Sequence, residues 1–203
     1  MDRSRKDSDT ASAVDAVWEW FSAALAWSLF TLPEQGIRIL STDCGYVQFL
    51  RTRTILQCEV SSNHMLGVQR ISADGEALLA ADGWELPGAD SNWVLEIRSP
   101  GEYTIYEHTA ASIVSALRDV LELSLPFELE TKGWITDWWD TTDPEYRYAI
   151  RGVGLLSGFW PSDRSASELL RFVEAGWAEL AESKRPGTYW RIAEGGVRYP
   201  VDR

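Results

Sequence analysis

The stretch GIRILSTDCGYVQFLRTRTILQCEVS, residues 36–61, indicates the fold class of this chain. It holds three short runs rich in β-branched and aromatic residues, at 36–42, 45–51 and 55–61, separated by the links TDC and TRT. Links this short join neighbouring antiparallel strands, so the stretch predicts a three-stranded meander. The third run also alternates apolar with polar side chains, as a strand with one buried face does: Leu56, Cys58 and Val60 against Gln57 and Glu59.

A tryptophan-rich apolar segment precedes these strands. Residues 11–31 have helical periodicity, and we expect residues 1–10 to be disordered. The main apolar face of this helix has a second ridge beside it, formed by Trp20 and Trp27. Few polar side chains occupy the opposite side. Two explanations stay open: the fold covers the helix on two sides, or the Trp20/Trp27 ridge contacts another chain.

The residues after the meander complete an α+β pattern. A short helix is expected at 74–84, a further strand at 92–98, and a long helix at 103–123 that ends before Pro126. This order predicts an antiparallel sheet with helices packed on one face, within a domain spanning residues 11–129.

Residues 130–203 form a second region, which we expect to be a mostly helical extension. Its clearest element is a helix at 165–184, where Ser165 and Glu168 make a capping box. A terminal hairpin is expected from the pairing of Tyr189–Ile192 with Val197–Tyr199 across a glycine turn.

Several of these motifs resemble a known family. The segments GYVQF (45–49), LQCEVSSN (56–63), GWELP (83–87) and NW (92–93) look like the type III secretion chaperone-like and YbjN-like superfamily, specifically its TY-Chap branch. The resemblance covers roughly residues 12–129. It implies a non-enzymatic role in binding peptides or proteins, without cofactor, by a small acidic domain that is often a homodimer.

The expected sheet and helices also suggest where a polypeptide would bind. Helices on one face leave the other face or an edge strand for an extended segment, and aromatic side chains there provide contact area at little entropic cost. The predicted contact residues are Tyr46, Gln48, Trp93 and the Trp20/Trp27 ridge. For Tyr46 and Trp93 the alternative is packing in the core.

Charge and composition narrow the function further. Net charge is −12, and residues 74–145 hold 16 of the 31 acidic side chains but 3 of the 19 basic ones. Such a segment repels phosphates, so a nucleic-acid partner is not expected, whereas a basic or amphipathic polypeptide is. An immunity or inhibitor protein that neutralises a basic effector is the alternative function. The apolar run at 17–30 contains Glu19 and is too short to span a bilayer, so we expect no membrane partner and a cytoplasmic location.

The residues that could support catalysis or metal binding lack the spacing that either requires. His64 and His108 occur outside any nucleophile or HxxxH pattern, and Cys44 and Cys58 form no CxxC pair. We therefore expect no enzyme activity and no metal.

One acidic stretch, DWWDTTD at 137–143, raises a different possibility. Asp137, Asp140 and Asp143 surround two tryptophans and could suit carbohydrate binding or cleavage. Asp143 precedes Pro144 as a helix start does, so we interpret the stretch as a junction between the two regions.

Overall fold

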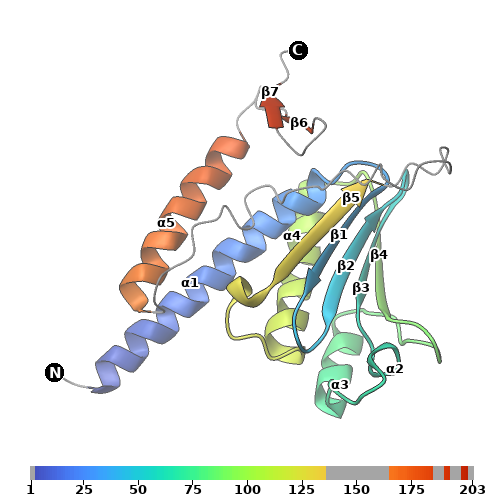
Figure 1. Cartoon of the computed structure of the whole chain (residues 1–203), viewed down its shortest axis with the longest axis horizontal. Coiled ribbons are helices and arrows are strands. Elements are labelled where there is room, and N and C mark those ends of the chain that lie inside the picture. The colour runs from blue at the N-terminus through green and yellow to red at the C-terminus, as the bar shows by residue number, and fades with distance from the viewer. Residues whose placement is uncertain (1–2, 136–164, 185–189, 193–197, 201–203) are drawn as a thin grey trace.

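The computed structural model describes residues 3–135, 165–184, 190–192 and 198–200 of the chain. Its centre is a five-stranded antiparallel sheet in the order β4-β3-β2-β1-β5. The strands are β1 (Gly36–Ser41), β2 (Tyr46–Arg51), β3 (Ile55–Val60), β4 (Trp93–Arg98) and β5 (Glu130–Ile135). Helices α1 (Arg3–Phe30) and α4 (Tyr103–Ser115) cover one face of this sheet (Figure 1). The predicted α+β class is confirmed.

Strands β1, β2 and β3 form the antiparallel meander that the short links predict. Thr42 Oγ1 accepts hydrogen bonds from the backbone N–H of Cys44 and Gly45, at 2.9 and 3.1 Å, and so closes the first link. Thr52 Oγ1 closes the second link in the same way, with Ile55 N–H at 3.2 Å. The two threonines thus fix the register that pairs Gln48 with Glu59 and Ile39 with Gln48.

Four smaller elements join the strands to the helices. Helices α2 (Asn63–Leu66) and α3 (Ala73–Ala81) lie between β3 and β4, and serine side chains cap the N-terminus of each. A π-helical turn, Ala116–Val120, continues α4, and α3 packs against it. A 3₁₀ turn, Pro126–Glu128, then leads into β5.

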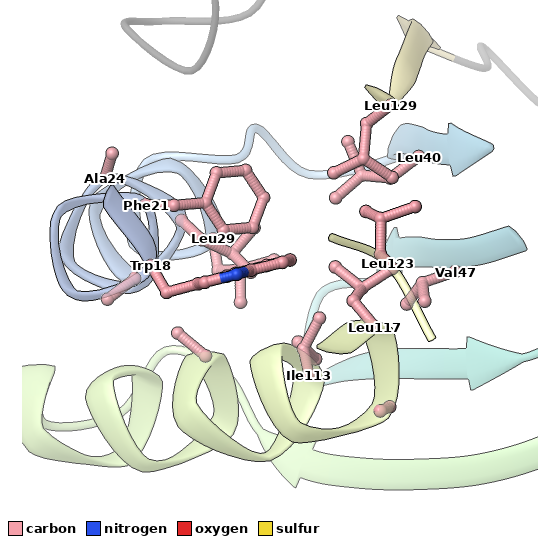
Figure 2. Packing of buried hydrophobic residues seen from close by; sticks show 14 of the residues in the cluster. Trp18, Phe21, Ala24, Leu29, Leu40, Val47, Ile113, Leu117, Leu123 and Leu129 are labelled. Atoms are coloured by element: carbon pink, nitrogen blue, oxygen red, sulfur yellow. The ribbon is translucent and has the colours of Figure 1, made fainter. Parts of the chain in front are cut away.

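The core lies between the sheet and the helices. The buried face of the meander contributes Leu40, Val47, Phe49, Leu56 and Cys58, each at most 1% exposed. Figure 2 shows Trp18 and Phe21 of α1 entering the same layer as Ile113 of α4 and Leu117. Arg38 is also buried there, and its guanidinium donates to Ser28 Oγ of α1.

Two boundaries differ from those that the sequence predicts. Helix α1 begins at Arg3, whereas the sequence predicts disorder over residues 1–10 and a helix from residue 11. No proline or glycine interrupts residues 3–10, so the helix extends through this polar segment at little cost. Strand β5 pairs with β1 although it lies beyond the expected boundary at 129. Its sequence, ETKGWI, lacks a clear apolar alternation, as is common for an edge strand.

The second region contributes helix α5 (Ala166–Ser183), which lies along α1 on the side away from the sheet (Figure 1). Strands β6 (Trp190–Ile192) and β7 (Arg198–Pro200) pair antiparallel, as the predicted hairpin requires. The contact of α5 with α1 centres on Trp20, whose ring meets Phe172 edge-on at 4.9 Å between centroids. The backbone of Gly176 also lies against Trp20, so closely that a Cβ at this position would overlap the indole.

The contact between Gly176 and Trp20 predicts whether Gly176→Ala raises or lowers the stability of the protein. In an exposed helix, Gly176→Ala would stabilise the protein by about 1 kcal/mol through helix propensity. Here the added methyl group collides with Trp20, so we expect the free energy of unfolding in urea to fall by about 1–3 kcal/mol. Gly176→Ala combined with Trp20→Phe should regain part of the loss, since the smaller ring leaves room. A stabilising Gly176→Ala would show that α5 does not pack on α1 in this way.

Candidate functional site

The polar side chains of the meander converge on the sheet face that α1 and α4 leave uncovered. Glu59 is at their centre and accepts three hydrogen bonds: from Gln48 Nε2 at 2.8 Å, Gln57 Nε2 at 2.8 Å and Asn92 Nδ2 at 2.7 Å. Asn92 Nδ2 also donates to the hydroxyl of Tyr46 at 3.0 Å. We call these five residues, Tyr46, Gln48, Gln57, Glu59 and Asn92, the polar strip.

The strip presents hydrogen-bond acceptors in fixed positions. Because Gln48 and Gln57 each direct their NH₂ group to Glu59, their amide oxygens point elsewhere. Within the described residues neither oxygen accepts a hydrogen bond. Aliphatic side chains, all half-buried, flank the strip on the same face: Ile37, Ile39, Leu50 and Ile55. This face therefore combines ordered acceptors with apolar area, which suits an extended polypeptide.

Strand β4 adds a partly open edge beside this face. Its one bridge outside the sheet, among the described residues, joins Val94 to Glu85, with Glu85 N–H to Val94 C=O at 2.7 Å. Backbone groups alternate in direction along a strand, so those of Glu96 and Arg98 also point away from β3. An edge of this kind can accept an added strand.

The five predicted contact residues occupy different environments. Tyr46 and Gln48 belong to the polar strip and are half-buried. Trp93 is 1% exposed and points into the core, although its neighbour Asn92 is in the strip. Trp20 is 2% exposed beneath α5. Trp27 is half-buried among Phe30 and Tyr103, at ring distances of 5.7 and 6.3 Å.

Helix α5 also covers part of Trp27. Lys184, at the C-terminal end of α5, places its Nζ 5.6 Å from the Trp27 ring centroid and donates to the Tyr103 hydroxyl at 3.0 Å. The Trp20/Trp27 ridge is thus in contact with the chain's own helix.

Sequence patterns predict only part of the polar strip. Tyr46 and Gln48 are among the predicted contact residues, whereas Gln57, Glu59 and Asn92 are not. The alternation of Gln57 and Glu59 with apolar neighbours is the signal that could have placed both side chains on the same side of the sheet as Gln48.

The described residues contain little that suits catalysis or metal binding. His64 in α2 and His108 in α4 are both exposed. Among the described residues, no group of three or more His, Cys, Asp or Glu side chains could hold a metal ion. The proposed carbohydrate site at Asp137, Asp140 and Asp143 lies outside the described residues. None of the described helices is long and apolar enough to cross a membrane.

Taken together, the fold defines an α+β protein whose sheet is covered by helices on one face and carries a polar strip on the other. The family described as T3SS (YopN, CesT) and YbjN peptide-binding chaperone 3, TY-Chap3, matches residues 11–135. The chain belongs to this family of peptide-binding chaperones, a class that is non-catalytic in general. The match includes β5 and ends before α5. Comparison with curated proteins and with solved structures gave no match.

The two thiols lie in contrasting surroundings. Cys58 is fully buried on the core face of β3, and burial, with a smaller contribution from the charge of Glu59, raises the pKa of its thiol well above the ordinary 9.0. Cys44 is half-buried in the first link. A protonated and inaccessible thiol is unreactive, so Cys58 is a core residue and not a nucleophile.

We expect Cys58 to make stability depend on pH in alkaline solution. The folded thiol stays protonated while the unfolded one ionises above about pH 9, so the unfolded state binds fewer protons there and stability falls as pH rises. The loss should approach about 1.4 kcal/mol per pH unit. Urea unfolding of wild type and Cys58→Ala across this range isolates the effect, with Cys44→Ala as the matched control. If the free energy of unfolding falls equally steeply with pH in wild type and in Cys58→Ala, Cys58 is not the cause of the alkaline loss of stability.

Proposed function

We propose that this protein is a cytoplasmic chaperone or adaptor that binds an extended segment of a client polypeptide on the uncovered face of its sheet. The observation that carries the proposal is the polar strip within a chain of the peptide-binding TY-Chap3 family. The amide oxygens of Gln48 and Gln57 are available to accept hydrogen bonds from N–H groups of the client. Because Glu59 already holds both side chains, little conformational entropy is lost on binding.

The predicted contact residues then take three different roles. Tyr46 and Gln48 contact the client directly, since both lie in the polar strip. Trp93 supports the strip from the core side, next to Asn92. Trp20 and Trp27 hold α5 against α1 and act on the client only through the stability of the helical layer. The homodimer implied by the family resemblance stays a prediction, which light scattering of the purified protein would test.

Binding of a peptide selected from a random library on the full-length protein tests this proposal. The labelled peptide is measured by fluorescence anisotropy against wild type, Tyr46→Ala and Gln48→Ala. Truncating a central contact residue commonly costs about 1–2 kcal/mol, so we expect its dissociation constant to rise about 5–30-fold in each variant. Thr104→Ala, an exposed position on α4, is the matched control and should bind as wild type does.

A further variant separates the face from the edge of the sheet. Glu96→Pro removes a backbone N–H that points away from β3, so the sheet should tolerate it while losing the ability to add a strand at β4. The proposal expects Glu96→Pro to bind the peptide normally. Loss of binding in Glu96→Pro with full binding in Tyr46→Ala and Gln48→Ala would place the client at the edge. Failure to select any peptide would contradict the function itself.

A further inference from the structure

A hollow lies on the helical side of the molecule, between α1, α4 and α5. It has a volume of about 480 Å³, which is within the range typical of ligand sites. Its walls follow one face of each long helix. The lining residues recur at helical spacing, from Asp15 through Glu19 to Ala26 along α1 and from Glu107 through Ala111 to Arg118 along α4 and its continuation.

The two helices run antiparallel: Phe30 at the end of α1 packs on Tyr103 at the start of α4, with ring centroids 5.4 Å apart, and Asp15 in the middle of α1 pairs with Arg118 just beyond the end of α4 at 2.9 Å. From Asp15 to Ala26 the α1 wall spans three turns, about 16 Å. Small side chains lie along both walls: Ala23 and Ala26 on α1 and Ala111 on α4, of which Ala111 is exposed, Ala23 half-buried and Ala26 buried. Alanines leave space above the two packed helices, so the hollow forms a short groove in which a further helix could pack. We call it the helical groove.

The charges of the groove are not balanced. Asp15 is paired with Arg118, but among the described residues neither Glu19 nor Glu107 has an ion-pair or hydrogen-bond partner. The groove thus carries three carboxylates and one guanidinium. Trp177 of α5 lies at its rim with 40% of its surface exposed. An indole face and two unpaired carboxylates all attract a cation, and the alanines provide the apolar surface between them.

We propose that the helical groove binds an amphipathic helix from a partner polypeptide, with an apolar stripe over the alanines and Lys or Arg side chains directed at Glu19 and Glu107. Charge complementarity excludes an acidic helix, and the length of the α1 wall fits about three turns of the partner. The proposal rests on the proposed function only in that the partner is a polypeptide. The groove is separate from the polar strip: its lining residues come from the helices, whereas those of the strip come from β2, β3 and Asn92, on the sheet face that α1 and α4 leave uncovered.

The test uses a synthetic 18-residue helical peptide with a leucine stripe and two lysines seven positions apart, labelled for fluorescence anisotropy against the full-length protein. Glu19→Gln with Glu107→Gln keeps the groove shape and removes its unpaired charge. We expect this double variant to weaken binding about tenfold in low salt and to flatten its salt dependence. Glu102→Gln with Glu122→Gln, two exposed carboxylates outside the groove, is the matched control and should bind as wild type does.

A blocking variant and a reversed peptide complete the experiment. Ala111 is exposed, so Ala111→Arg should fold normally, as circular dichroism would verify, and abolish binding by filling the groove. A peptide with glutamates in place of lysines should not bind.

Three binding results would overturn the proposal: no binding of the basic peptide, equal weakening of binding by the control pair, or unchanged binding in Ala111→Arg. Self-association of the protein that Ala111→Arg abolishes would also overturn it, because the groove would then be an interface between two copies of this chain. The library-selected peptide is expected to bind through Tyr46 and Gln48, so the groove variants should bind it as wild type does. If that peptide binds but the basic helical peptide does not, the groove proposal fails while the proposed function stands.

Discussion

The structure depends on helix α1 being packed from three directions. The sheet meets it through the core and through the hydrogen bond from Arg38 to Ser28, and α4 and α5 pack along it as well. From Ala13 onward most of its side chains are buried or half-buried. A helix with two charged side chains among residues 13–30 would expose a large apolar surface if one of these neighbours were absent. The close approach of Gly176 to Trp20 shows how tightly the third neighbour packs. The second region of the chain therefore completes the helical layer of the first.

This arrangement decides which surfaces are free to bind a partner. Within the part of the chain that the structure describes, α1 and α4 bury one face of the sheet and α5 packs on the outer side of α1. Two surfaces there stand out as candidate binding sites: the polar strip on the other face of the sheet, and the hollow between α1 and α4 beside α5. Their chemistry differs. The strip has a carboxylate that accepts hydrogen bonds from three amide groups, whereas two carboxylates of the groove, Glu19 and Glu107, have no partners among the described residues. The first suits backbone N–H groups and the second suits cationic side chains.

Local patterns predict much of this structure. The alternation in residues 55–60 and the short threonine-led links predict the meander, and helical periodicity predicts the helices observed as α1, α4 and α5. Strand β5 cannot be predicted in this way, because pairing with β1 across about 90 residues is a tertiary effect. The environment of Trp20 cannot be predicted from local patterns either. Composition allows either a partner chain or the chain's own fold to cover this side chain, and only the position of α5 distinguishes the two. The polar strip is predicted in part, through Tyr46 and Gln48, but the role of Glu59 depends on side chains from separate segments meeting on one face.

The most direct measurement is site-specific photo-crosslinking of a bound client. A benzophenone amino acid placed at Ile39 lies beside the polar strip, since Ile39 pairs with Gln48 across β1 and β2 and is half-buried on the same face. One placed at Leu170 lies on the outward face of α5, where the leucine is 45% exposed. If the uncovered face of the sheet receives the client, irradiation of the complex should give an adduct from position 39 and none from position 170. An adduct from position 170 with none from position 39 would show that clients bind over the helical layer, and would contradict binding at the polar strip.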